Sequence, residues 1–165
     1  MASSADDLRP MMESTLVEFF NCYPRSVRNK DPSLLSTTLT EECARYLKPD
    51  SFLAKHPFVK AVETNAEYEA HMAPEIMMME EVRFKILDSV VDPLKRKASA
   101  RVEHWTKLAG RKPTILEMCW FVDFTEDGRK ISRIIEFIDT SIASKMIEEL
   151  AEGGYNMEET AASRA

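Results

Sequence analysis

The sequence predicts a single α+β domain in which N-terminal helices pack around a curved antiparallel sheet formed by the C-terminal half. Apolar residues recur at helical spacing in the first part of the chain, and from Glu81 they recur at every second residue. A length of 165 residues corresponds to about one domain. Helices followed by consecutive long strands favour α+β over a parallel sheet, because parallel strands need crossover connections between them.

The composition excludes several classes of function. The net charge of −6 disfavours nucleic-acid binding, because phosphate recognition needs a basic surface. No apolar run approaches the roughly 18 residues of a membrane span, so membrane insertion is not expected. The cysteines Cys22, Cys43 and Cys119 form neither a disulfide framework nor a metal-ligand pattern. The first residues are polar and acidic, unlike a signal peptide, and we expect the protein to be cytoplasmic.

Helix signals precede the sheet and return once after it. We expect one helix from Asp6 or Asp7 to Pro24, and two short helices that begin at Asp31 and at Pro49. A further helix should begin at a capping box of Thr64 and Glu67, and a last one should run from Thr140 or Ser141 to Gly153. Residues beyond the last helix resemble a frayed end. We therefore place one domain at residues 6–152 and a flexible C-terminal tail at residues 153–165.

The strand signals are long and follow one another closely. The expected strands run from Thr40 to Leu47, from Glu81 to Asp92, from Arg96 to Lys107, from Thr114 to Phe124 and from Lys130 to Asp139. The dipeptide Asp127-Gly128 between the last two is a strong signal for a two-residue hairpin turn.

That turn predicts which side chains share a face of the sheet. It pairs Thr125 with Lys130 and, continued without interruption, Cys119 with Glu136. One face would then carry Glu117, Cys119, Phe121, Asp123, Ser132, Ile134, Glu136 and Ile138. The opposite face would carry Met118, Trp120, Val122, Phe124, Ile131, Arg133, Ile135 and Phe137, and is apolar enough to require a partner surface.

Glu117 and Glu136 are the leading catalytic candidates. As diagonal neighbours in an apolar cavity, both carboxyl groups would have raised pKa values, which suits general acid–base work near neutral pH. The alternative is that both glutamates lie on a solvated face, paired with Arg45, Arg101 or Arg133. The apolar neighbours Phe121, Ile134 and Ile138 leave the two interpretations evenly balanced.

Two histidines are further candidates. His104 lies in a strand and is either a third catalytic group or a structural residue, and the loop after it does not determine whether His104 or Arg101 faces the glutamates. Tyr68 and His71, on the helix broken by Pro74, are expected to cap the mouth of the pocket. No phosphate loop, dinucleotide fingerprint, metal-ligand spacing or nucleophile elbow is present, so we expect no cofactor and no metal.

Several short motifs resemble one family in order and spacing over residues 12–150. They are Glu42-Cys43, Pro49-x-Ser51, Asn65-x-Glu67-Tyr68, Glu117, the run from Phe124 to Ile131, and Glu136-Phe137-Ile138-Asp139. This pattern resembles fungal SnoaL-like proteins of the nuclear-transport-factor-two-like superfamily, which are cone-shaped α+β barrels. Within the family it is most similar to ring-rearranging and ring-closing enzymes of the terretonin, austinol and paraherquonin pathways of meroterpenoid biosynthesis.

The resemblance implies a cofactor-independent isomerase or cyclase that moves protons on a hydrophobic polyketide–terpenoid intermediate, by ring rearrangement or lactone formation, with lyase or dehydratase chemistry as a variant. It implies that Glu117 and Glu136 lie inside the cone. Arg45 stands where many relatives have histidine, which implies binding of a carbonyl or carboxylate rather than proton transfer. Phe20, Tyr68, His71, Phe121 and Arg101 are the other expected substrate-binding residues.

The resemblance also implies a homodimer formed through the apolar face of the sheet, burying Trp120, Val122 and Ile135. A non-catalytic domain that binds a small molecule or a protein on the same fold is the alternative, because a fold alone does not determine function.

Overall fold

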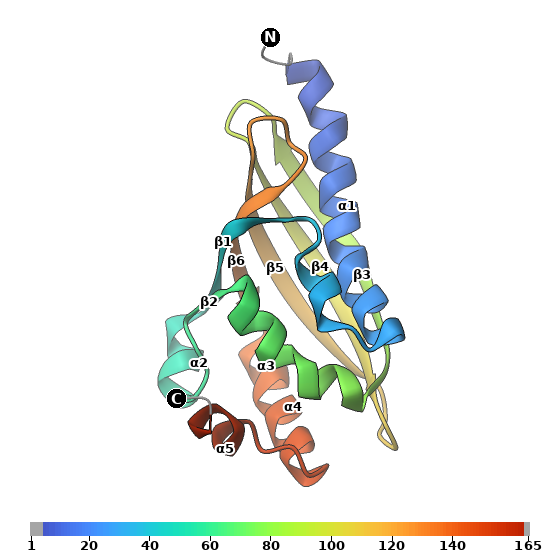
Figure 1. Ribbon diagram of the computed structural model, residues 1–165, viewed down its shortest axis with the longest axis vertical. Coiled ribbons are helices and arrows are strands. Elements are labelled where there is room, and N and C mark those ends of the chain that lie inside the picture. The colour runs from blue at the N-terminus through green and yellow to red at the C-terminus, as the bar shows by residue number, and fades with distance from the viewer. Residues whose placement is uncertain (1–4, 164–165) are drawn as a thin grey trace.

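The computed structural model describes residues 5–163 as an open six-stranded sheet with helices on one side (Figure 1). In chain order the elements are α1 (Ala5–Asn29), η1 (Pro32–Ser36), β1 (Leu39–Lys48), α2 (Asp50–Lys55), β2 (Val62–Thr64), α3 (Asn65–Met78), β3 (Met79–Asp92), β4 (Lys97–Leu108), β5 (Thr114–Phe124), β6 (Ile131–Ile138), α4 (Thr140–Glu152) and α5 (Met157–Ala162). Among these described residues no helix combines the length and apolar character needed to cross a membrane.

The strand order is β2-β1-β6-β5-β4-β3, and the expected α+β class is confirmed. The four long strands from β3 to β6 pair antiparallel, as predicted. The β1 strand is different, because it pairs parallel to β6 and antiparallel to β2. The sheet is therefore mixed rather than purely antiparallel. The connection from β1 to β6 runs through α2, β2, α3 and the strands β3 to β5, and is long enough for the crossover that a parallel pair requires.

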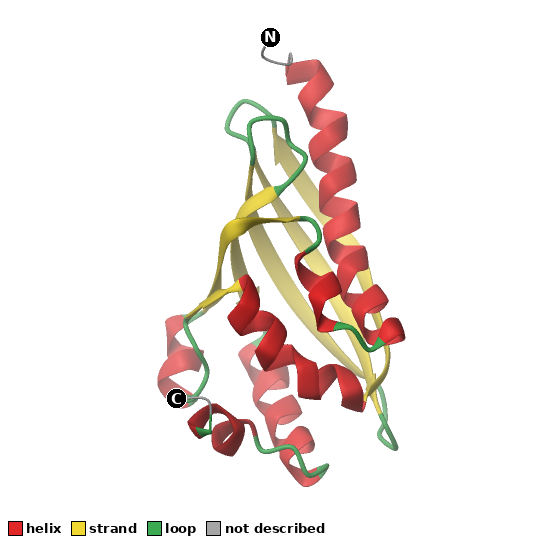
Figure 2. Cartoon of the chain, viewed as in Figure 1, coloured by secondary structure: helices red, strands yellow, loops and turns green. Residues whose placement is uncertain are grey.

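The helices cover the concave face of the sheet (Figure 2). The stripe Met12, Leu16, Phe19 and Phe20 of α1 is buried in the main core against inward side chains of β4, β5 and β6. The helix does not end at Pro24 as expected but continues to Asn29. The proline costs one backbone hydrogen bond, and burial of Val27 in the turn that follows offsets this cost.

The sequence predictions for the start of α3 and for the C-terminal residues have different outcomes. The capping box of Thr64 and Glu67 at the start of α3 is confirmed in both directions. The expected flexible tail is different in the structure, because residues Met157–Ala162 form α5 and Tyr155 is buried. The Asn156 side chain accepts hydrogen bonds from the first turn of α5, and burial of Tyr155 fixes the segment to the domain.

The pairing at the turn between β5 and β6 follows the prediction, but the turn itself and the strands beyond it do not. The Gly128 amide donates to the Thr125 carbonyl at 2.9 Å, so the turn is centred on Glu126 and Asp127 rather than on Asp127 and Gly128. The Thr125 amide donates to the Lys130 carbonyl at 3.0 Å, which is the predicted pairing. One step further, Phe124 pairs with Ile131 whereas Asp123 pairs with Arg133, so Ser132 is an extra residue in a β-bulge. Because side chains alternate between the two faces of a sheet, this single extra residue changes which side chains of β5 share a face with those of β6. Trp120, not Cys119, therefore stands opposite Glu136.

Candidate functional site

A cavity of about 160 Å³ lies between the inner face of the sheet and helices α3 and α4. Most of its wall is apolar, from side chains such as Leu116, Met118, Ile147 and Leu150. The polar groups on the wall are Tyr23, Arg45, Lys60, Glu63, Tyr68, His71, Glu75, His104 and Glu136. A few convergent polar groups in a mainly apolar cavity are typical of a small-molecule site.

The central feature is an ion pair between Arg45 on β1 and Glu136 on β6. Nη1 of Arg45 donates to Oε2 of Glu136 at 3.2 Å, and the two side chains are only 8% and 13% exposed. The Tyr68 ring lies under the guanidinium, with its centroid 3.7 Å from the guanidinium carbon. Burial, the aromatic ring and the carboxylate together fix the position of Arg45, so the pair is preorganised.

The same surroundings determine the electrostatics of Glu136. Burial raises the pKa of its carboxyl group, and Glu63 adds to this rise. Arg45 and His71 act against it, because a nearby positive charge favours the carboxylate. A carboxyl group with a raised pKa beside a fixed cation is a suitable group for taking up and returning a proton near neutral pH.

A second charged cluster surrounds His71 on α3. Its Nδ1 lies 3.2 Å from Oε1 of Glu63, and its Nε2 lies 3.3 Å from Oε1 of Glu75. Burial alone lowers the pKa of His71, but these two carboxylates outweigh it and raise the pKa to about 10. His71 is therefore an imidazolium at neutral pH and acts as a fixed positive charge rather than as a base.

His104 on β4 faces the cavity, which answers the question of register left open by the sequence. Its ring stacks on Phe84 at 4.4 Å, and its Nε2 lies 2.9 Å from the Thr106 hydroxyl. Complete burial lowers the pKa of His104 to about 4, so the ring is neutral. These contacts favour the structural interpretation of His104 over the catalytic one.

The expected placement of Glu117, Arg101 and Phe121 inside the cone is wrong. All three project from the outer face of the sheet, where Arg101 and Glu117 form an ion pair with side chains 49% and 54% exposed. Phe121 is also exposed on this face. The bulge at Ser132 explains the error, because the sequence argument carried an uninterrupted register from the turn to Glu136. Glu117 and Glu136 therefore lie on opposite faces and cannot share a ligand.

The same error in register assigned Trp120 and Val122 to the wrong face of the sheet. Both were expected on the outer apolar face, and both are buried on the inner face. Trp120 lines the cavity, and Phe20 lies behind it with ring centroids 5.7 Å apart. Only Ile135 of the three predicted interface residues projects outward, next to Phe121.

Sequence reasoning missed Glu63, Glu75 and the inward position of Trp120. The signal for Glu75 was its spacing of four residues from His71, which places both on one face of α3. Glu63 belongs to β2, a strand of only three residues, and that strand was not predicted. Within residues 5–163 no cluster of histidine, cysteine or acidic side chains has the arrangement of a metal site.

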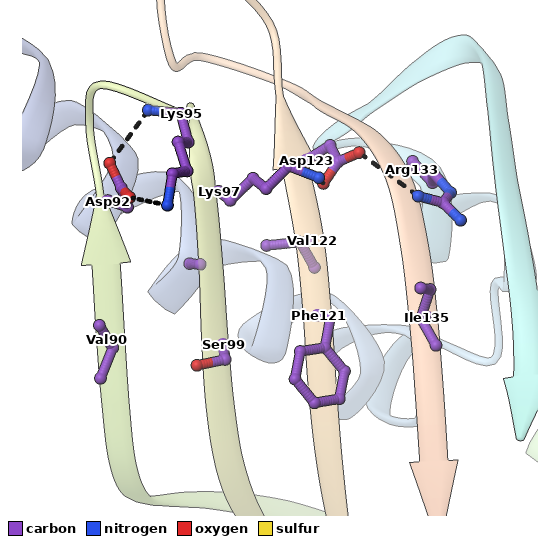
Figure 3. Close-up of a pocket in the computed structure, with 11 residues that line it drawn as sticks. Val90, Asp92, Lys95, Lys97, Ser99, Phe121, Val122, Asp123, Arg133 and Ile135 are labelled. Atoms are coloured by element: carbon purple, nitrogen blue, oxygen red, sulfur yellow. Dashed lines mark hydrogen bonds and ion pairs between the residues drawn. The ribbon is translucent and has the colours of Figure 1, made fainter. Parts of the chain in front are cut away.

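The outer face of the sheet has a separate, shallow hollow of about 410 Å³ (Figure 3). A row of cross-strand neighbours, Val90, Ser99, Phe121 and Ile135, runs across β3, β4, β5 and β6. At one end Asp123 lies 3.0 Å from Lys97 and 3.8 Å from Arg133. This hollow holds no buried titratable group, which separates it from the chemistry of the inner cavity.

Comparisons with known proteins agree with the fold. No protein-family model matches the sequence, and a search of curated proteins finds no significant match. Among solved structures, the BvnE pinacolase of Penicillium brevicompactum superimposes with a TM-score of 0.76 at 18% identity, over 90% of this chain and 99% of that one. PrhC of Penicillium brasilianum NBRC 6234 gives 0.71 at 18% identity, over 90% and 97%.

A bacterial protein described as a SnoaL-like polyketide cyclase, from Shewanella denitrificans OS-217, gives a TM-score of 0.60 at 11% identity, over 85% of this chain and 98% of that one. At these identities the likeness concerns the fold. The resemblance expected from the short motifs is thereby confirmed at the level of architecture, and the chain has the SnoaL-like fold.

Proposed function

We propose that the protein is a cofactor-independent isomerase or cyclase that moves a proton on a hydrophobic carbonyl compound. The observation that carries this proposal is the Arg45–Glu136 pair, held almost without solvent in a cavity with an apolar wall. A base and a cation in fixed contact supply the two elements that enolisation requires: a group that takes the proton, and a charge that stabilises the oxygen.

In the proposed reaction the Glu136 carboxylate removes a proton from the carbon next to the carbonyl. The electron pair moves onto the carbonyl oxygen, whose negative charge Arg45 stabilises. The protonated Glu136 then returns its proton at another position of the substrate. Atoms and electrons balance without an oxidant, and the result is isomerisation or ring closure according to where the electron pair attacks.

The substrate class that we propose is a polyketide–terpenoid intermediate of fungal secondary metabolism. The apolar wall supports a hydrophobic skeleton, since burial of apolar surface is the main driving force for binding such a molecule. Among the structures of the same fold, one fungal protein named a pinacolase and one bacterial protein described as a SnoaL-like polyketide cyclase support rearrangement or ring closure.

The proposal is tested by deuterium exchange at the acidic carbon of 1-tetralone, a compact bicyclic ketone, followed by NMR in D₂O. We expect the protein to accelerate exchange and Glu136→Gln to reduce the acceleration by roughly 10²–10⁴. Glu117→Gln is the matched control, because Glu117 makes a similar ion pair on the outer face, and it is expected to leave the rate unchanged. Equal rates for Glu136→Gln and the unmodified protein would contradict the proposal. Binding of 1-tetralone without any exchange would support the non-catalytic binding domain instead.

We also propose that the outer face of the sheet forms a homodimer interface, with residues different from those first expected. Val90, Ile115, Phe121 and Phe137 are between 44% and 63% exposed, an unusual number of large apolar side chains for one solvated face. The salt bridges of Asp123 at one end would form part of its polar rim.

The oligomeric state tests this interface directly. Light scattering during size-exclusion chromatography is expected to give a dimer mass for the unmodified protein and a monomer mass for Phe121→Lys. Leu94→Lys is the control, because Leu94 is 82% exposed in the β3–β4 turn, away from the apolar row. A monomeric unmodified protein, or a dimer that survives Phe121→Lys, would exclude the interface.

A further inference from the structure

The indole N–H of Trp120 is a buried donor without a hydrogen-bond acceptor among residues 5–163. Trp120 is 4% exposed and lines the cavity. Its ring makes T-shaped contacts with Phe19 and Phe20 at centroid distances of 5.4 and 5.7 Å, and with Phe84 at 6.4 Å. These aromatic contacts fix the plane of the indole, and none of the three side chains carries a nitrogen or oxygen acceptor for its N–H.

Buried donors in native proteins are nearly always paired, so one that remains unpaired on the wall of a cavity calls for a specific explanation. Packing alone would be served equally by phenylalanine, which fills the same aromatic layer without a polar atom. A buried, unpaired indole N–H on a residue that lines a cavity is explained when the ligand supplies the acceptor.

Trp120 is also placed beside the proposed reaction centre. It is the cross-strand partner of Glu136, and with the register of the bulge both side chains project into the cavity. The guanidinium carbon of Arg45 lies 5.6 Å from the centroid of the Trp120 ring. Three adjacent strands, β1, β6 and β5, thus contribute a guanidinium, a carboxylate and an indole to one patch of the wall.

The charges on the wall discriminate between classes of ligand. In the two ion-pair clusters the carboxylates Glu63, Glu75 and Glu136 outnumber the cations Arg45 and His71. Arg45 is already neutralised by Glu136. The third cation on the wall, Lys60, is 59% exposed and already paired with Glu67 at 2.8 Å. A carboxylate ligand would therefore add a further buried negative charge without a free buried cation to balance it, at a large desolvation cost. The cavity therefore favours a neutral acceptor such as a ketone oxygen.

We infer that the substrate is a neutral hydroxy ketone whose carbonyl oxygen accepts a hydrogen bond from Nε1 of Trp120 next to Arg45, while its hydroxyl group donates to Glu136. This inference rests on the proposed function, since it assigns the substrate of the same cavity. It makes Trp120 the second donor to the oxygen on which negative charge develops, in addition to Arg45.

The test compares the affinities of four probes of nearly equal shape: 2-hydroxy-1-tetralone, 1-tetralone, the hydrocarbon tetralin and 1,2,3,4-tetrahydro-1-naphthoate. The unmodified protein is expected to bind them in that order, with the hydroxy ketone tightest and the carboxylate weakest. Trp120→Phe, which keeps an aromatic ring and removes the N–H, is expected to weaken binding of both ketones about five- to tenfold, the effect of one hydrogen bond, and to leave tetralin unchanged. Trp105→Phe is the control, because Trp105 stacks on Arg83 on the outer face of the sheet.

A second measurement on the unmodified chain keeps the inference testable if Trp120→Phe does not fold. With ¹⁵N-labelled tryptophan the two indole N–H signals are observed separately, since the chain has two tryptophans, Trp105 and Trp120. Binding of 1-tetralone is expected to slow solvent exchange of the Trp120 indole proton and leave that of Trp105 unaffected, whereas tetralin has a smaller effect.

The outcomes separate this inference from the proposed function. Equal loss of affinity for ketone and hydrocarbon in Trp120→Phe, tighter binding of the carboxylate, or no preference of the unmodified protein for ketones would overturn the inference. If Glu136→Gln still abolishes deuterium exchange in that case, the proposed function stands. If Glu136→Gln retains exchange while the ketone preference depends on Trp120, the binding assignment stands and the catalytic proposal fails.

Discussion

The sheet carries two arginine–glutamate pairs that are nearly identical in geometry and opposite in environment. Arg45 and Glu136 lie 3.2 Å apart on the inner face, with side chains 8% and 13% exposed. Arg101 and Glu117 lie 3.1 Å apart on the outer face, with side chains 49% and 54% exposed. Since the contact distances agree, any difference in what the two pairs do must come from the medium around them.

The difference in burial explains why the Arg45–Glu136 pair is a candidate for chemistry and the Arg101–Glu117 pair is not. In water the charges of Arg101 and Glu117 are solvated separately and gain little from each other. In the cavity, Arg45 and Glu136 have lost most of their hydration, so each depends on the other and on Tyr68. A reacting oxygen or proton placed between the inner pair would feel fields that water does not screen.

Removal of the two arginines should give the largest contrast. Arg45→Ala leaves Glu136 buried without its cation and is expected to lower the free energy of unfolding by about 3–5 kcal/mol. Arg101→Ala is expected to lower it by less than about 1 kcal/mol. Urea unfolding at neutral pH measures both. The double variant Arg45→Ala, Glu136→Gln should recover part of the loss, because it removes the uncompensated charge. Equal losses for the two single variants would show that burial does not distinguish the pairs.

The second largest expected effect is on the pH dependence of stability, because burial keeps His104 uncharged. Burial lowers the pKa of His104 to about 4 from its ordinary value of 6.5, so between these pH values the unfolded chain binds a proton that the folded chain does not. The stability from neutral His104 is complete above pH 6.5 and is lost as the pH falls toward 4. The loss approaches about 1.4 kcal/mol per pH unit in that window.

Comparison of the unmodified protein with His104→Phe isolates this contribution, because other acid-sensitive groups affect both proteins alike. The difference in free energy of unfolding between the two should change with pH from 6.5 to 4 and remain constant above pH 7. A difference that is independent of pH would mean that His104 is protonated as readily in the folded protein as in the unfolded one.

The pH dependence of activity sharpens the comparison at the level of Glu136. Burial raises the pKa of Glu136 above the ordinary glutamate value of 4.5, and a base must be ionised to act. Deuterium exchange of 1-tetralone should therefore be lost as the pH falls through a midpoint above 4.5, by about tenfold per pH unit below it. Arg45→Gln should move the midpoint to higher pH, because the opposing positive charge is gone. Arg101→Ala should not move it, and a shift in this variant would show that the outer pair influences the cavity.

The sequence predicted the elements well because their signals are local. The strand Thr114–Phe124 begins and ends where periodicity placed it, and the capping box at Thr64 depends on residues three apart. The pairing of Thr125 with Lys130 was predicted correctly for the same reason, although the bond from Gly128 to Thr125 centres the turn one residue earlier than expected. Arg45, Tyr68, His71 and Glu136 face one cavity, as expected, and so does His104, whose orientation the sequence left open.

What failed depended on one residue that has no local signal. Ser132 looks like an ordinary strand residue in the sequence. As the extra residue of a bulge, however, it places Trp120 rather than Cys119 opposite Glu136. Alternation propagates such an error along the whole strand pair, which is why Glu117, Phe121 and Trp120 were all assigned to the wrong face together. The apolar composition of both faces hid the mistake, because Phe121 and Ile135 outside look much like Val122 and Ile134 inside.

The smallest expected effect concerns salt, and it completes the comparison of the two pairs. Double-mutant cycles with arginine to alanine and glutamate to glutamine give the coupling energy of each pair. For Arg101 and Glu117 we expect about 0.2–1 kcal/mol at low salt, falling toward zero at about 1 M salt, where the Debye length is only about 3 Å. For Arg45 and Glu136 the coupling should be larger and nearly independent of salt, because ions do not enter the space between the buried groups. A coupling for the inner pair that falls with salt as steeply as the outer one would mean that solvent reaches the cavity freely, and the preorganised environment on which the catalytic proposal depends would be absent.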